Sequence, residues 1–274
     1  LQGNAGENPE LSRNGKRCKT QVRAPAKSVS RGGTSMRSIF LFLFLTLVTT
    51  PIMSQENPIH KDSVNIKAWA TNCTVSRGLL NIADPSIMDG GTNLASYGVE
   101  ENATGIADNV IVSLGDAGSA ILTFDTPISN KPGYDFAVFE NSFSDPTLGP
   151  PYFLELAFVE VSSDGVNFFR FPATSNTQTT TQIGPFQTMD NSGINNLAGK
   201  FTLYYGTPFD LEELDGTPGL DINNITHVKI IDVVGCIQNE YATFDSLGNK
   251  INDPWPSNFA SSGFDLDAVA VIEN

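Results

Sequence analysis

The last apolar run of the chain, from Ser262 to Ile272, constrains the fold more than any other segment. Small and branched apolar residues fill both faces of Leu266–Ile272, which predicts a β-strand that is buried on both sides. Asp265 and Asp267 stand two residues apart at its start, so on an extended strand their carboxylates point the same way. An unpaired buried charge is costly, so we expect a bound cation or a ring of backbone N–H donors to satisfy both carboxylates.

The rest of the chain also has the pattern of a β protein. From Ile66 onward, short strand-like runs alternate with turns rich in Gly, Asn, Asp and Pro, and the one credible short helix is Phe209–Leu214. Many short strands without an internal repeat predict an all-β fold, specifically a jelly-roll β-sandwich. The predicted strands are Val64–Ala70, Asn109–Leu114, Ser119–Phe124, Tyr134–Phe139, Phe153–Ser162, Asn167–Arg170, Lys200–Tyr205, His227–Val234 and Leu266–Ile272.

The N-terminal part has the organisation of an export signal. At 36–55 a basic start, an apolar run and small polar residues follow one another, as in a secretory signal peptide, and the apolar run is too short to span a membrane. We expect 1–35 to be an untranslated or disordered extension, 56–64 a loose leader, and 65–274 a single β-sandwich domain, secreted or at a bacterial cell surface. No sorting tail or anchor follows the last strand, which leaves truncation there open.

Charge and cysteine content narrow the classes of partner. Residues 1–55 hold eight of the sixteen Lys and Arg and two of the thirty Asp and Glu, which leaves a net charge of −20 for the remainder by subtraction. Such a surface repels nucleic acid and suits calcium, cationic partners or neutral ligands, although solubility alone accounts for much of it. Cys73 and Cys236 could form one disulfide in an exported protein, but their spacing does not decide between a bond and two thiols.

Several segments of the chain together form a recognisable pattern. In order, they are Ser113–Ser119, Ile121–Phe124, Asp135–Asn141, Val159–Phe168, Leu197–Gly199, Gly206–Leu211 and Gly263–Val269. They resemble secreted bacterial surface domains with a discoidin-like, or galactose-binding-like, jelly roll, in cell-surface proteins of the Bacteroidetes type. Some of these proteins accompany TonB-dependent outer-membrane receptors, including those for cobalamin. The resemblance implies a binding module that takes a glycan or similar small ligand, with an outer-membrane receptor or another surface protein as a possible partner.

Calcium is the expected cofactor. It takes six to eight oxygen ligands from carboxylates, amides and carbonyls, and Glu140, Asn141, Asp265 and Asp267 supply that chemistry at the ends of two predicted strands. The resemblance implies the same, because related jelly rolls place a structural calcium against an Asp of the last strand, the position of Asp267. The alternative is that these carboxylates cap turn amides without a metal.

Four long loops interrupt the strands, at Ala83–Asp108, Asn141–Pro151, Ala173–Ala198 and Gly235–Gly263, and loops of this length are usually functional or mobile. Aromatic rings flanked by Asn and Asp suit a sugar ring. The alternative is that these aromatics pin the loops onto the sheets. The predicted ligand-binding residues, five in the Gly235–Gly263 loop and one beside the Asn141–Pro151 loop, are Tyr241, Asn252, Asp253, Trp255, Phe259 and Tyr152.

The chain offers little for catalysis. His60 lies in the predicted leader, and His227 begins a strand without a nucleophile motif nearby, so a hydrolytic triad is not indicated. A glycosidase would need two suitably placed carboxylates. We therefore expect a non-catalytic binding module, with an adhesive or structural surface protein as the first alternative and a glycoside hydrolase or its accessory domain as the less favoured one. The carboxylates that a glycosidase could use are Asp135, Glu140, Glu155, Asp265 and Asp267.

Overall fold

The computed structural model describes residues 56–273, and these residues confirm a predominantly β fold. The predicted extension at 1–35 and signal peptide at 36–55 lie outside the described residues. Within 56–273 the helical segments are two short 3-10 turns, η1 (Glu100–Ala103) and η2 (Leu211–Leu214). The second falls inside the predicted helix, and Asp210 caps it by accepting a hydrogen bond from the backbone N–H of Glu212.

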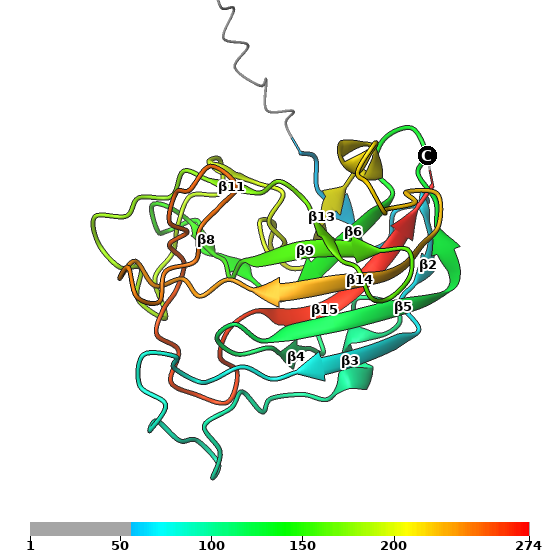
Figure 1. The fold of residues 1–274 in the computed structure, drawn as a ribbon. Helices are drawn as coiled ribbons and strands as arrows, with labels where there is room; N and C mark the ends of the chain where they lie inside the picture. The colour runs from blue at the N-terminus through cyan, green and yellow to red at the C-terminus, as the bar shows by residue number, and fades with distance from the viewer. Residues whose placement is uncertain (1–55, 274) are drawn as a thin grey trace, which may run out of the picture. The chain divides into compact units, whose positions relative to one another are not determined.

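The predicted last strand lies in the middle of a six-stranded antiparallel sheet (Figure 1). β15 (Asp265–Ile272) has all but one residue buried, which confirms a strand covered on both faces. A register shift between Leu266 and Ala268, against β6, leaves Asp267 as the extra residue of a bulge. The order is β1 (Ile59–His60), β13 (Tyr205–Phe209), β6 (Phe136–Glu140), β15 and β2 (Ile66–Trp69), with β4 (Val112–Ser113) also paired to β15.

A second antiparallel sheet has five strands, and its centre is β14 (Ile225–Asp232), paired on both sides. Val228 and Ile230 alternate with less buried neighbours, as expected for a strand with one face in the core. The order is β10 (Phe169–Arg170), β9 (Ala157–Ser162), β14, β5 (Ser119–Ile128) and β3 (Asn72–Ser76).

Two small ribbons lie among the long loops. They are β7 (Phe143–Ser144) with β8 (Tyr152–Phe153), and β11 (Thr174–Ser175) with β12 (Ile194–Asn195). In Figure 1, β8, β11 and the orange chain that leads back to β15 gather beyond one end of the sheets. The loops at 141–151, 173–198 and 235–263 thus meet, although they are far apart in the sequence.

The main hydrophobic core takes side chains from both sheets. Leu122, Val228 and Ile230 of the five-stranded sheet share one buried cluster with Val138 and Val269 of the other. Full burial of one such side chain stabilises the fold by about 1.5–3 kcal/mol. A separate cluster lies under the loops, so these loops are packed segments with a core of their own. Its members include Leu154, Leu156, Phe158, Ile183, Met189, Ile194 and Ile251.

The strand predictions differ from the structure in several places. The predicted strand Phe153–Ser162, for example, is interrupted between β8 and β9. The predicted strand Lys200–Tyr205 is displaced, because β13 begins at Tyr205, after a turn in which Tyr204 has a φ of 69°. The strand β3 was not predicted, because its sequence Asn-Cys-Thr-Val-Ser is largely polar. It lies at the edge of its sheet, where alternate side chains face solvent and polarity is tolerated.

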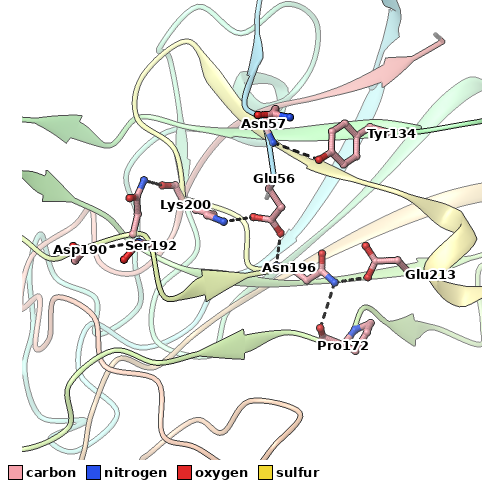
Figure 2. A network of polar contacts seen from close by, with 10 residues as sticks. Glu56, Asn57, Tyr134, Pro172, Asp190, Ser192, Asn196, Lys200 and Glu213 are labelled. Atoms are coloured by element: carbon pink, nitrogen blue, oxygen red, sulfur yellow. Dashed lines mark hydrogen bonds and ion pairs between the residues drawn. The ribbon is translucent and has the colours of Figure 1, made fainter. Parts of the chain in front are cut away.

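The segment 56–64 is part of the fold, so its prediction as a loose leader is wrong. Ile59 and His60 pair with β13, and the buried Glu56 carboxylate lies 2.6 Å from Lys200 Nζ (Figure 2). The other Glu56 oxygen accepts a hydrogen bond of 2.7 Å from the backbone N–H of Asn196. A buried carboxylate that is both paired and hydrogen-bonded attaches this segment firmly to the domain.

Replacing Lys200 by Met is expected to lower the free energy of unfolding by about 2 kcal/mol, because Glu56 would keep a buried charge without its partner. This loss of stability is smaller than for a fully buried ion pair, because the Lys200 side chain keeps some contact with solvent. Urea unfolding measures it, with the double variant Glu56→Gln/Lys200→Met as the control that removes both charges. A single variant no less stable than the double one would contradict this interpretation.

Candidate functional site: a loop pocket and a buried carboxylate cluster

A pocket of about 790 Å³ opens between the β7–β8 loop and the long connection from β11 to β12. Both segments lie in predicted long loops. The lining residues are Leu148, Gly149, Pro150, Asn176, Thr177, Gln178, Thr181, Gln182, Ile183, Phe186, Gln187, Thr188, Met189, Asp190, Ser192 and Gly193.

The side chain of Asn252 does not line the pocket but is hydrogen-bonded to one of its walls. Its buried side-chain oxygen accepts hydrogen bonds from the backbone N–H of Ile183 (3.0 Å) and from Gln182 Nε2 (3.1 Å). Its amide nitrogen donates to the carbonyl oxygens of Gln178 (2.6 Å) and Thr181 (2.9 Å). One fully engaged amide therefore fixes the path of the whole segment 178–183.

The pocket surface is mixed and nearly uncharged, and more of it is apolar than polar. Amide and hydroxyl residues make up half of the lining residues, and the Asn176 side chain forms no hydrogen bond with any described residue. The one carboxylate among the lining residues is Asp190, whose pKa is lowered by hydrogen bonds from Ser192. Phe186 adds an aromatic face that is 79% exposed and stacks on Phe259 at 5.7 Å between ring centroids.

The predicted ligand-binding residues of the last loop have structural roles in most cases. Trp255 is 6% exposed, and its indole Nε1 donates a hydrogen bond of 2.9 Å to Asp116 Oδ2. The buried Asp253 accepts one of 3.0 Å from the backbone N–H of Leu156. Tyr241 packs against the cluster around Trp255. The prediction of Trp255, Asn252 and Asp253 as surface contacts is therefore wrong, because long loops need internal aromatic and polar anchors.

The remaining predicted ligand residues lie nearer the pocket. Phe259 supports the exposed ring of Phe186 from behind. Tyr152 packs partly against the cluster under the loops, and its backbone pairs with that of Met189, a pocket residue. Phe186 itself was not predicted, although an aromatic residue in the polar loop Ala173–Ala198 was a usable signal.

Three buried carboxylates gather where β6 ends and β15 begins. Glu140 and Glu155 are 2% and 7% exposed. Burial raises the pKa of each well above its usual range, and the neighbouring carboxylate of Asp265 adds to both shifts. The pKa of Asp265 rises to about 7 through burial, although hydrogen bonds from Ser113 and Asn141 oppose the rise.

Glu155 is brought to this place by a close approach of two chain segments. Gly199 has a φ of 81°, and a Cβ there would lie 1.8 Å from the carbonyl oxygen of Glu155. Next to it, Ala198 pairs with Ala157 at the start of β9. Only glycine accommodates both the left-handed backbone and the contact, so Gly199 lets the 197–199 segment press against Glu155.

Asp267 accepts hydrogen bonds from a turn. Its two carboxylate oxygens accept hydrogen bonds of 3.2 Å from the backbone N–H groups of Asp108 and Asn109. Burial raises its pKa to about 6. Within residues 56–273, no three Asp, Glu, His or Cys side chains form a group that could hold a metal.

Of the two alternatives for Cys73 and Cys236, the structure has two free thiols, so the disulfide between them is not formed. Cys73 packs against the main core from the edge strand β3, whereas Cys236 lies in the cluster with Val234 and Trp255. The two thiols therefore belong to different parts of the core. Burial raises the pKa of Cys73 to about 12, so the thiol stays protonated.

The other groups considered for catalysis have local partners. The buried Asp135 accepts hydrogen bonds from the backbone N–H groups of Lys131 (2.7 Å) and Leu211 (2.8 Å). His227 Nδ1 lies 2.8 Å from Thr226 Oγ1.

The chain matches no known family model and no curated protein. Over residues 56–273, no helix has both the length and the apolar character that a membrane crossing requires.

Proposed function

We propose that this chain is a non-catalytic binding module that holds a neutral, hydroxyl-rich ligand, such as a short glycan, in the loop pocket. The observation that carries the proposal is the pocket itself: a cavity of about 790 Å³ in which amides and hydroxyls lie beside apolar side chains and one exposed ring. Sugars present apolar C–H faces and a rim of hydroxyls. An aromatic face and nearby amides therefore complement both parts of such a ligand.

The arrangement of charge favours binding over hydrolysis. A glycosidase places two carboxylates on either side of the bond that it cleaves. Among the pocket-lining residues Asp190 is the only carboxylate, and Ser192 already engages it. The carboxylates with strongly raised pKa values, Glu140 and Glu155, are not among the lining residues.

The Phe186→Ala variant is expected to weaken glycan binding about tenfold, which corresponds to about 1.4 kcal/mol of lost stacking. A glycan array identifies the ligand, and calorimetry then compares the variants. Phe244→Ala is the matched control, because Phe244 is also an exposed phenylalanine but does not line the pocket. Absence of any glycan binding by the wild-type protein, or equal losses in both variants, would refute the proposal.

Three further features belong to this proposal. The two antiparallel sheets with a shared core are compatible with a jelly roll, to which the sequence resemblance pointed. Secretion to a bacterial cell surface is supported by the signal-like sequence at 36–55. A bound calcium ion is supported by the buried carboxylates at the ends of β6 and β15.

An adhesive or receptor-associated role is the second candidate. One observation favours it: the 83–108 loop exposes several large apolar side chains to solvent. Surface groups of this kind often mark contacts with another protein, such as an outer-membrane receptor. The most exposed of them are Met88, Tyr97, Val99 and Ile106.

A further inference from the structure

The most unusual feature outside the pocket is a pair of buried glutamates whose carboxylates accept few hydrogen bonds. Glu140 Oε2 accepts a hydrogen bond of 2.8 Å from the backbone N–H of Ser142, but Oε1 is buried and has no hydrogen-bond partner. The Glu155 carboxylate accepts no hydrogen bond from any residue in 56–273. Such an arrangement is costly unless something else neutralises the carboxylates.

No basic side chain of the described residues fills this role. The ion pairs in 56–273 join His60 and Lys61 to Asp62, Arg170 and Lys229 to Glu160, and Lys200 to Glu56. Burial raises the pKa of Asp265, and the positive charge of Arg77 opposes this rise. The Arg77 guanidinium, however, donates its hydrogen bonds to the carbonyl oxygens of Tyr97, Ser113 and Gly98. The cluster therefore combines several carboxylates with no dedicated cation.

We propose that Glu140 and Glu155 bind a hard divalent cation of the calcium type. Oxygen ligands alone favour calcium or magnesium, and calcium tolerates an irregular set completed by amide or carbonyl oxygens and water. Two carboxylates with neutral oxygens need no third acidic ligand, which is consistent with the absence of a three-residue group in 56–273. Asp265 adds negative charge beside the pair. This site does not use Asp267.

The position gives the cation a structural role. Glu140 ends β6 in the six-stranded sheet, whereas Glu155 stands two residues before β9 in the five-stranded sheet. A cation held by both would link the two sheets at the end where the loops gather. This inference does not depend on the proposed glycan pocket, since neither glutamate lines it.

The test adds calcium chloride to chelator-treated wild-type protein and measures thermal melting and binding heat. A folded-state ligand at about 100 times its dissociation constant should raise the melting temperature by about 5–10 °C. Glu140→Gln and Glu155→Gln should each weaken calcium binding at least about tenfold. In EDTA both variants should melt no lower than wild type, because each loses an uncompensated buried charge.

Asp267→Asn is the matched control, since Asp267 is also a buried acid of the same region but its oxygens accept backbone hydrogen bonds. It should keep the calcium response. Wild-type protein without binding heat and without a calcium-dependent melting shift would overturn the proposal and indicate protonated glutamates. Loss of the response in Asp267→Asn alone would overturn it as well and return the site to Asp267.

Discussion

Replacing Trp255 by Ala is expected to lower the free energy of unfolding by about 3–5 kcal/mol, the usual cost of removing a large buried aromatic side chain. Trp255 fills a cluster with Val234 and Cys236. The variant also removes the indole N–H that donates to Asp116, which leaves a buried carboxylate with one donor fewer. Denaturant unfolding by urea measures the loss through the shift of the midpoint.

The Trp255→Phe variant separates the two contributions, because it keeps an aromatic ring and loses only the N–H donor and part of the volume. We expect it to recover roughly half of the loss. Phe186→Ala is the opposite control: that ring is exposed, so its removal should leave stability within about 0.5 kcal/mol of wild type. If Trp255→Ala were as stable as wild type, the packing role of Trp255 would be wrong.

In the presence of EDTA, the protein is expected to be less stable at about pH 7.5 than at about pH 4.5, by about 5 kcal/mol. Burial raises the pKa of Asp116 to about 6, of Asp135 to about 6, of Asp265 to about 7 and of Asp267 to about 6. A rise of two units corresponds to about 3 kcal/mol for one group. Structural relaxation of the partly ionised protein should keep the total loss of stability well below the sum of the free energies that the four pKa shifts represent.

The direction follows from proton binding. The usual pKa of Asp is 3.8, so between that pH and about 6–7 the folded state holds more protons than the unfolded chain. The free energy of unfolding therefore falls as the pH rises through this window. Exposed carboxylates act in the opposite sense at lower pH. Backbone N–H donors from Asn167 and Val166, for example, lower the pKa of Asp164, so its contribution is lost as the pH falls below the usual range.

Urea unfolding at a series of pH values measures this dependence. EDTA is needed because a bound cation would also stabilise the ionised carboxylates and so mask the cost of their burial. The Asp116→Asn variant serves as a control: it keeps an acceptor for the Trp255 indole but cannot ionise, so its stability should depend less on pH. A wild-type stability that is flat or rises between the two pH values would show that the buried carboxylates stay ionised at little cost.

Local sequence patterns were sufficient for the character of individual strands. Apolar residues on both faces predicted the burial of Leu266–Ile272, and short strand-like runs predicted the strands that became β6 and β14. These signals depend on the period of the extended chain, which neighbouring residues report by themselves. The edge strand β3 was not predicted, because a strand at an exposed edge does not require apolar residues.

The candidate site was only partly visible in the sequence. Long loops were recognised from their composition, and two of them line the pocket. The sequence also singled out Glu140 and Asp265 as acids that need a partner. It did not show that Glu155 joins them or that Asp267 instead caps the turn at Asp108 and Asn109.

The sequence by itself determined the principal buried strands, the long loops and the need of Asp265 and Asp267 for a partner. The tertiary structure decided which aromatic and polar side chains serve the loops and which face a ligand. Trp255 meets Asp116 across 139 residues, and Asn252 meets Ile183 across 69. Such partners are set by how two sheets and three loops pack together, because hydrogen bonds and burial depend on distance in space and local periodicity does not encode that distance.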